Sequence, residues 1–455
     1  MLKPIVLKNG LTIIRLPRAN SKMFITGFVT LSGSAQELGN FPQGMSRMIE
    51  KLFRCGTDKH PSAKNLTNAL EGMGADYVSQ TSQELTQHYI SVPSNHQYKA
   101  VSTLAEIIQH SYFDQKDIER EKQNTIEFVK TFDAGDGKRS VLALSNLYAN
   151  HSLGLPISGN IETLTSIKKT DIDNYLFHQY HTNRSYVILA GNFDNKTLSD
   201  LVDQEWGYWN PKNRRFIESP EFSYQDAGLL PRIQYRQRGL PYTELVISFL
   251  LDEGLKPKYE QDSKDEPRVL TESEIEELKD RKLSQDAELF VMNTILGQGY
   301  SSRLWSKGVE EELFFNSIVS DLIRFKNTGY LQIQGKTDNS QFTFALECIF
   351  SVLDSLKQTT VSINELAKAK EYIKGRLILE NENLLSSTLW QVENMLGSSL
   401  IYDLDDLIGK INKVEASAIR SRALDLFIPQ RMAITTLGTA KETRLVDKLI
   451  SKYIG

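Results

Sequence analysis

Residues 44–57 read Gly-Met-Ser-Arg-Met-Ile-Glu-Lys-Leu-Phe-Arg-Cys-Gly-Thr. Their apolar side chains recur at steps of three and four residues, which predicts an amphipathic helix that ends near Gly56. On such a helix Arg47, Glu50 and Lys51 lie three and four residues apart and project from one face. The stretch therefore predicts a helix that buries an apolar face and places two cations around one carboxylate.

The spacing of these three residues matches an inverted zinc-peptidase motif, His-x-x-Glu-His. That motif places two imidazoles one helical turn apart on a metal ion, with a glutamate between them that acts on the metal-bound water. In this chain Arg47 and Lys51 occupy the two histidine positions, and Glu50 occupies the glutamate position.

The segments around the predicted helix resemble the pitrilysin/insulinase (M16) family of zinc peptidases, which includes the mitochondrial processing peptidase and the core proteins of the cytochrome bc1 complex. Ser32-Gly33-Ser34, Glu37, Gly44 and Gly56-Thr57 fall where that family has them. The resemblance also implies a third metal ligand, a glutamate about 76 residues beyond the second histidine position. In this sequence the count reaches Glu127.

Arginine and lysine cannot replace histidine as zinc ligands. A guanidinium has no lone pair to donate, and an ammonium offers three donors and no acceptor. A metal ion here would also face two positive charges, each repulsion being about 4 kcal/mol at about 4 Å with an effective dielectric constant near 20. We therefore expect no metal and no cofactor, and hypothesise that Arg47 and Lys51 neutralise Glu50 and Glu127. The alternative is that both cations point to solvent.

The second part of the chain carries another match to the family. Residues 296–304 read Leu-Gly-Gln-Gly-Tyr-Ser-Ser-Arg-Leu and resemble the signature of the family's second half. In active members an Arg and then a Tyr follow and help to hold the substrate carbonyl at the zinc. Val309 and Asn316 occupy those positions here, so the donor pair that would stabilise an oxyanion is missing.

An internal repeat predicts the architecture. Residues 186–193 and 432–439 are similar strand-like runs about 247 residues apart, and each comes before an amphipathic helix. We therefore predict an α+β fold of two homologous halves, residues 1–215 and 229–455, each a mostly antiparallel sheet covered by helices. The resemblance implies a short connection where this chain has a charged segment, about residues 252–282, so we predict an insertion there, a surface loop with a helical stretch over 272–280.

Composition excludes several classes of protein. The chain has 455 residues and a net charge of −4, and this lack of basic excess argues against nucleic-acid binding. Two distant cysteines, Cys55 and Cys348, favour a reducing compartment. The first residues lead directly into a strand–turn–strand pattern, and no apolar run is long enough to span a bilayer. We expect a cytoplasmic protein without a membrane span.

The resemblance implies a function for such a chain. Active family members assemble four halves around a closed chamber, so a chain of two halves implies a homodimer or a heterodimer with an active M16 subunit. We predict a non-catalytic subunit that binds peptide or unfolded polypeptide, or that has a structural role like the bc1 core proteins. The competing hypothesis is an active zinc metalloendopeptidase with unusual ligands.

Overall fold

The computed structural model describes residues 2–134, 137–149, 151–209, 217–218, 222, 232–237, 239–251, 272–398, 404–439 and 443–454. The chain divides into two compact units. Unit 1 comprises Met1–Lys138, His151–Pro220 and Asn383–Leu389, and unit 2 comprises Arg139–Asn150, Glu221–Glu382 and Trp390–Gly455. The predicted division into residues 1–215 and 229–455 stays a prediction, because most of the intervening linker lies outside the described residues.

Unit 1 is built on a six-stranded sheet in the order β1-β2-β6-β3-β5-β4. Only the β2–β6 pair is parallel, and the other neighbours are antiparallel. β3 lies in the middle of this sheet and is buried along nearly its whole length. The strands are β1 (Leu2–Val6), β2 (Thr12–Pro17), β3 (Met23–Thr30), β4 (Asp76–Thr81), β5 (Thr86–Pro93) and β6 (Ser185–Gly191).

Unit 2 is built on a five-stranded sheet in the order β7-β11-β8-β10-β9. Here too one pair, β7–β11, is parallel, and the other neighbours are antiparallel. This order repeats that of β2-β6-β3-β5-β4, so the predicted fold of two homologous halves with mostly antiparallel sheets is confirmed. The strands are β7 (Arg232–Gln237), β8 (Tyr242–Leu250), β9 (Ser317–Arg324), β10 (Gly329–Asp338) and β11 (Met432–Gly438).

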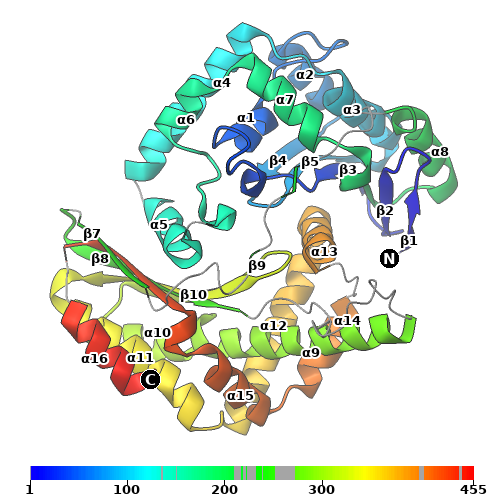
Figure 1. The fold of residues 1–455 in the computed structure, drawn as a ribbon. Helices are drawn as coiled ribbons and strands as arrows, with labels where there is room; N and C mark the ends of the chain where they lie inside the picture. The colour runs from blue at the N-terminus through cyan, green and yellow to red at the C-terminus, as the bar shows by residue number, and fades with distance from the viewer. Residues whose placement is uncertain are drawn as a thin grey trace, which may run out of the picture. The chain divides into compact units, whose positions relative to one another are not determined.

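Helices cover the unit 1 sheet (Figure 1). Aromatic packing fixes part of the core of this unit. Phe28 on β3 stacks on Trp206 with 5.4 Å between ring centroids and on Tyr180 with 6.1 Å. The helices of this unit are α1 (Met45–Leu52), α2 (Ala63–Glu71), α3 (Gln97–His110), α4 (Gln115–Ala134), α6 (Ile161–Ser166), α7 (Lys169–Gln179) and α8 (Asn195–Trp206).

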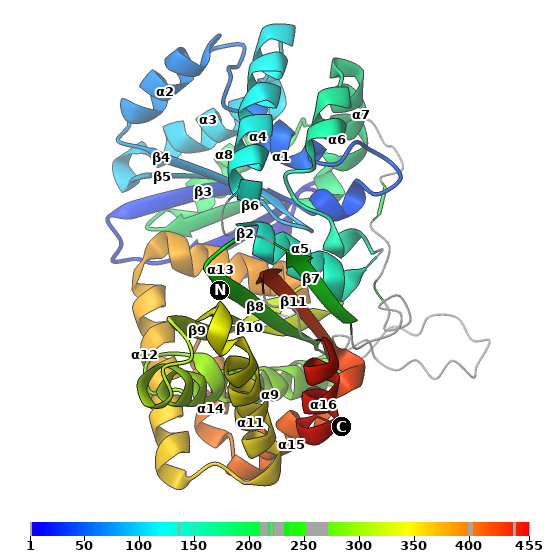
Figure 2. The same ribbon diagram turned by 90° about the vertical axis from the view of Figure 1, so that its left-hand side faces the viewer.

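Helices also cover the unit 2 sheet (Figure 2). The longest, α9 (Glu272–Gly297), begins with the helical stretch predicted over residues 272–280 and continues through the signature glycine at 297. Residues 252–271 of the predicted insertion lie outside the described residues. The other helices of this unit are α5 (Gly137–Tyr148, from Arg139 on), α10 (Arg303–Trp305), α11 (Phe342–Gln358), α12 (Ile363–Glu382), α13 (Leu384–Ser398, from Trp390 on), α14 (Leu404–Lys413), α15 (Ala416–Leu426) and α16 (Thr443–Tyr453).

Short helical turns connect these elements. They are the 3-10 turns η1 (Ser34–Gln36), η2 (Ser94–His96), η3 (Ser152–Gly154), η4 (Thr182–Arg184), η6 (Asn339–Gln341) and η7 (Pro429–Arg431), and the π-helical turn η5 (Ser306–Glu311). Within the part of the chain that the structure describes, no helix is both long enough and apolar enough to cross a bilayer.

The close packing of β3 against β5 can be tested at a glycine. A Cβ atom on Gly27 would lie 2.4 Å from a ring carbon of Tyr89, so Gly27→Ala forces the ring or the strand to move. We expect a loss of about 1–3 kcal/mol in the free energy of unfolding. The control is Gly375→Ala on α12, where nothing lies within 4 Å, and it should stabilise by about 0.5–1 kcal/mol. Equal denaturation midpoints for both variants would contradict this packing.

Candidate functional site

Glu37 fixes the start of helix α1. Its carboxyl accepts hydrogen bonds from the backbone N–H of Gly44 at 2.7 Å, the backbone N–H of Ser46 at 2.8 Å and the Ser46 hydroxyl at 2.5 Å. Gly44 has φ 92°, and a Cβ there would lie 2.7 Å from the Ser158 carbonyl oxygen, so the position favours glycine. Burial raises the pKa of Glu37 to about 8, although the bonds from Ser46 and Gly44 oppose this rise.

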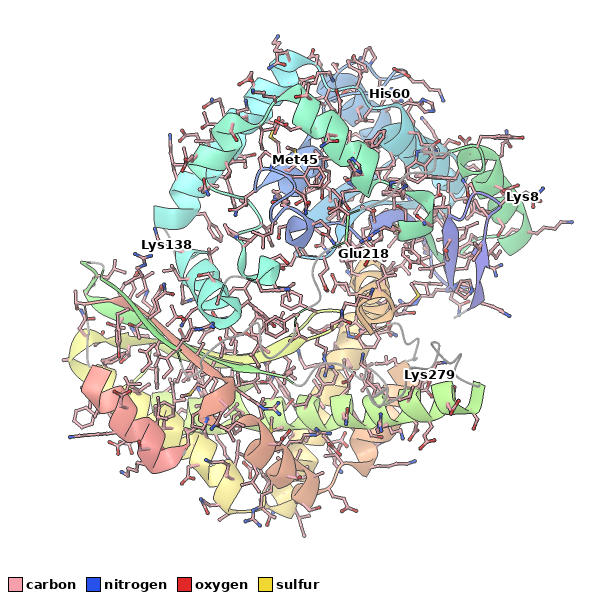
Figure 3. The ribbon with its side chains drawn as sticks, in the orientation of Figure 1. Lys8, Met45, His60, Lys138, Glu218 and Lys279 are labelled. Atoms are coloured by element: carbon pink, nitrogen blue, oxygen red, sulfur yellow. The ribbon has the colours of Figure 1, made fainter. Side chains whose placement is uncertain are left out.

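The apolar face of α1 holds the helix against the unit 1 core. Met45 (Figure 3), Met48, Ile49 and Leu52 have no exposed surface. This arrangement confirms the predicted amphipathic helix, which ends at Leu52, four residues before Gly56. The opposite face carries Arg47, Glu50 and Lys51.

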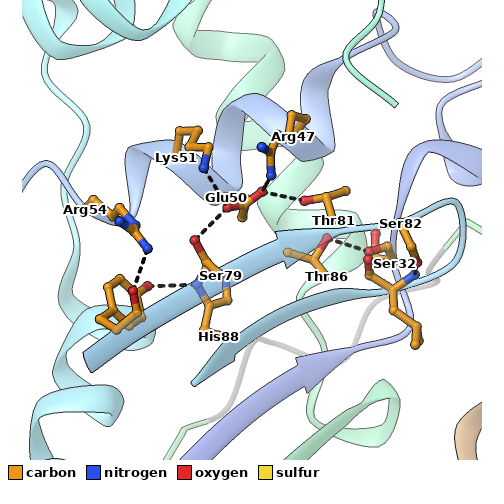
Figure 4. Close-up of polar contacts among 12 residues, drawn as sticks. Ser32, Arg47, Glu50, Lys51, Arg54, Ser79, Thr81, Ser82, Thr86 and His88 are labelled. Atoms are coloured by element: carbon orange, nitrogen blue, oxygen red, sulfur yellow. Dashed lines mark hydrogen bonds and ion pairs between the residues drawn. The ribbon is translucent and has the colours of Figure 1, made fainter. Parts of the chain in front are cut away.

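The two cations of α1 both pair with Glu50 (Figure 4). Arg47 Nη1 donates to Glu50 Oε2, and Lys51 Nζ lies 3.3 Å from Glu50 Oε1. The Glu50 side chain is fully buried, whereas those of Arg47 and Lys51 are 26% and 33% exposed. The predicted salt bridge around Glu50 is therefore formed, and the alternative in which both cations point only to solvent is not.

Strand β4 completes the surroundings of Glu50. The Ser79 hydroxyl donates to Oε1 at 2.6 Å and the Thr81 hydroxyl to Oε2 at 3.1 Å. Each carboxylate oxygen therefore has one charged and one hydroxyl partner. Burial alone would raise the pKa of Glu50, but the charge of Arg47, the bond from Ser79 and the charge of Lys51 lower it below its usual value. Glu50 is held as a carboxylate.

A buried histidine lies next to this cluster. His88 on β5 has no exposed surface, and its Nδ1 is 2.8 Å from the Tyr77 hydroxyl. Phe53 contacts the ring edge to face at 5.1 Å between centroids. Burial lowers the pKa of His88 to about 4; the charge of Glu50 opposes this shift, and those of Arg54 and Lys51 add to it. His88 is therefore neutral at physiological pH.

Glu127 does not join the cluster, contrary to our prediction. Its side chain on α4 is 66% exposed and pairs with Lys130 at 2.7 Å. The neighbouring positions Ile126 and Val129 are buried, so the helix presents Glu127 on its outer face. Among the described residues, the ion pairs of Arg47 and Lys51 are with Glu50.

The second-half positions lie in unit 2. Val309 is on η5 and packs against the apolar core of that unit. Asn316 is an exposed residue just before β9, and its backbone N–H donates to the Lys336 carbonyl oxygen at 2.9 Å. Arg303 of the signature segment forms a two-pronged ion pair with Glu365, with both N···O distances 2.8 Å.

Ser79, Thr81 and His88 were not among the residues selected from the sequence. A signal was available, because residues 77, 79 and 81 alternate along β4 and thus share one face of the sheet. The sequence does not say which face meets α1. Only the packing of α1 on β4 identifies Ser79 and Thr81 as partners of Glu50.

The donor set around Glu50 does not fit zinc. Arg47 and Lys51 offer N–H donors where a metal requires lone pairs, and both side chains form ion pairs with Glu50. Within the described ranges, no three His, Cys, Asp or Glu side chains are grouped so that they could hold a metal ion.

Comparisons with known proteins identify the fold first. A solved structure from Pseudomonas fluorescens, described as a peptidase M16 inactive domain, superposes with a TM-score of 0.81 over 97% of this chain and 99% of that chain, at 15% identity. The chain therefore has the fold of M16 peptidases.

The sequence comparisons then give the family. The description "Insulinase (Peptidase family M16)" matches residues 19–160, and "Peptidase M16 inactive domain" matches residues 166–373. The uncharacterized zinc protease YmxG of Bacillus subtilis is 27% identical over 94% of this chain and 96% of its own length. A probable mitochondrial-processing peptidase subunit beta of Schizosaccharomyces pombe is 25% identical over 95% of this chain and 90% of its own length. This chain belongs to the M16 peptidase family.

The charge balance at Glu50 leads to a stability prediction. Arg47→Ala leaves a buried carboxylate with one of its two cations, and we expect a loss of about 1–3 kcal/mol in the free energy of unfolding. The matched control is Lys130→Ala, which breaks the exposed pair with Glu127 and should cost less than about 0.5 kcal/mol. Urea unfolding of the full chain measures both. Equal losses would mean that Glu50 does not depend on Arg47.

The buried histidine predicts a pH dependence. Between about pH 4 and pH 6.5 the unfolded chain binds a proton at His88 that the folded chain does not. The contribution of His88 to stability should therefore rise with pH across this window, by on the order of 3 kcal/mol at most, and be lost as the pH falls. Glu37, whose pKa is raised to about 8 in the folded chain, contributes a slope of opposite sign above about pH 4.5, so the test compares each variant with the wild type. His88→Gln should therefore make the slope of the urea midpoint against pH more negative than in the wild type, whereas the control His96→Gln, at a half-buried position, should keep the wild-type slope. Parallel curves for all three proteins would contradict a neutral His88.

Proposed function

We propose that this protein is a non-catalytic M16 subunit, a pseudo-peptidase. The observation that carries the proposal is the occupancy of Glu50. In active relatives the matching glutamate acts on zinc-bound water. Here both of its oxygens are engaged, Oε1 by Lys51 and Ser79, and Oε2 by Arg47 and Thr81. A carboxylate with a lowered pKa and four partners is a poor general base.

A second observation supports the loss of catalysis. The positions that correspond to the family's oxyanion-stabilising Arg and Tyr hold Val309 and Asn316. Val309 has no polar side-chain group and packs against the unit 2 core. We propose that this chain supplies neither the base nor the oxyanion donor, either in its own unit 1 or to a partner. This favours a structural or binding role.

The proposed mode of peptide binding is strand addition to the unit 1 sheet. β4 is an edge strand of that sheet, beside α1, and an edge strand can pair with an extended peptide. One edge carbonyl, that of Tyr77, already accepts a hydrogen bond from Arg54 Nη2 at 2.7 Å. This contact leaves the Ser79–Thr81 end of β4 as the part we assign to a bound peptide or unfolded polypeptide.

The proposed assembly is a dimer, with itself or with an active M16 subunit. Support comes from the Schizosaccharomyces pombe relative, whose name describes it as one subunit of a processing peptidase. We place the protein in the cytoplasm, because Cys55 and Cys348 are both buried free thiols. The competing proposal, an active zinc endopeptidase, would need ligands other than Arg47 and Lys51.

Zinc content and oligomeric state test this proposal together. The purified full chain should hold substoichiometric zinc and show no chelator-sensitive peptide cleavage. From its native host it should copurify in equal amounts with a chain that carries His-x-x-Glu-His, or elute as a dimer of its own 51.7 kDa chain. As a positive control, the double variant Arg47→His, Lys51→His should retain more zinc than the wild type.

Two results would overturn parts of the proposal. One zinc ion per wild-type chain together with chelator-sensitive cleavage would identify an active peptidase. A monomer without a partner at micromolar concentration would remove the proposed dimer but leave the non-catalytic assignment in place.

A further inference from the structure

Unit 2 contains a cavity of about 630 Å³. Its walls come from α9, the end of β9 and the turn that follows, α12, α13 and α15. A volume of this size is in the range of small-molecule sites, which are mostly apolar with a few polar groups that orient the ligand. The residues of α9 that line the cavity lie between Lys282 and Phe290, and they follow Lys279, which Figure 3 labels on the same helix.

Arg324 is the main polar feature of the cavity wall. One guanidinium nitrogen, Nη1, pairs with Asp286 at 2.6 Å, and the guanidinium lies 5.6 Å from the centre of the Phe290 ring. The other two nitrogens, Nε and Nη2, are buried and have no hydrogen-bond partner among the described residues. These two N–H groups form one edge of the planar guanidinium, and that edge matches the two oxygens of a carboxylate.

Two cations of the cavity wall, Arg324 and Lys282, lie near one deeply buried acid, Asp286. Lys282 also lines the cavity, and burial lowers its pKa, with Asp286 opposing and Arg324 adding to this shift. Asp286, whose side chain is 4% exposed, is therefore shared by two cations. The other acidic residues of the wall lie nearer to solvent: Glu380 and Asp425 are about half exposed and pair with Arg376 and Arg431, and Glu393 is exposed. An anion at Arg324 would balance the inner end of the cavity.

The rest of the wall suits an apolar group. Leu289, Phe290, Ile373, Leu377 and Trp390 all line the same cavity. A ligand with a single charged end and an apolar body would place its charge at Arg324 and its body against these side chains. A doubly charged or fully polar ligand would lose hydration along this apolar wall without compensation.

We propose that this cavity binds a carboxylate attached to an apolar body, with the carboxylate on the Nε–Nη2 edge of Arg324 and the body against Leu377 and Trp390. Both nitrogens are shielded from solvent in the structure. Binding as proposed therefore requires the Arg324 side chain to turn toward the cavity. The same chemistry occurs in a free apolar acid and in the C-terminal residue of a peptide. The site lies wholly in unit 2 and does not depend on the proposed loss of catalysis.

Binding of matched acids and amides to the full chain tests the proposal. The probes are octanoate against octanamide, N-acetyl-phenylalanine against its amide, and a pentapeptide ending in phenylalanine with a free or an amidated C-terminus. Calorimetry should show each acid binding at least about tenfold tighter than its amide, because only the acid pairs with the guanidinium. The acid that binds most tightly identifies the source. Trp390 fluorescence should change on binding, and Trp390→Phe should remove that change.

Two variants of the cavity wall and one control test where the ligand binds. Arg324→Lys keeps the charge beside Asp286 but removes the planar edge, and should weaken acid binding by about tenfold or more. Leu377→Trp should fill the cavity and abolish binding of every probe. The matched control Arg376→Lys, on α12 but outside the cavity wall, should leave the affinity unchanged. Folding of each variant is checked by its unfolding midpoint.

Several results would overturn the proposal. They are equal affinities of acid and amide, no saturable binding at millimolar concentration, or acid binding that survives both Arg324→Lys and Leu377→Trp in folded protein. None of these results bears on zinc content or on the oligomeric state, so the failure of this inference and the failure of the pseudo-peptidase proposal are distinguishable.

Discussion

A buried carboxylate at Glu50 is the constraint on which the candidate site depends. Taking an ionised carboxylate out of water is costly unless opposite charge and hydrogen bonds replace the lost hydration. Arg47 and Lys51 supply the charge, and Ser79 and Thr81 supply the hydrogen bonds. Because the hydroxyls come from β4 and the cations from α1, the same contacts fix how this helix lies on the edge of the sheet.

The anchoring of α1 at its start and along its length strengthens this constraint. At the start of the helix, Glu37 accepts hydrogen bonds from the backbone N–H groups of Gly44 and Ser46 and from the Ser46 hydroxyl. Along its length the apolar face is closed into the core. The helix therefore has little freedom to turn Glu50 toward solvent. In such a rigid setting the side chains at positions 47 and 51 decide what the carboxylate can do.

The sequence predicted this part of the molecule well because helical spacing is a local property. The three-residue and four-residue steps were sufficient to place Arg47 and Lys51 beside Glu50, and the repeat predicted that β11 corresponds to β6. Glu127 shows where prediction from the sequence fails. Counting residues identified a position on α4, but the outward direction of that side chain depends on which face of the helix packs inward. The roles of Ser79 and Arg324 likewise depend on tertiary contacts between distant segments.

The positive charge at positions 47 and 51 is the feature that would let an M16 fold keep Glu50 buried after the proposed loss of the metal. In active relatives two neutral imidazoles bind a divalent cation, whose charge lies beside the glutamate of the motif and the further glutamate ligand. Here one guanidinium and one ammonium bring the same total positive charge to Glu50. The exchange preserves the electrostatic balance that lets the carboxylate stay buried, but it replaces two lone pairs with N–H donors. The fold and the buried acid are thus compatible both with a metal held by two histidines and with an arginine–lysine pair. Activation of water by a metal is compatible only with the two histidines.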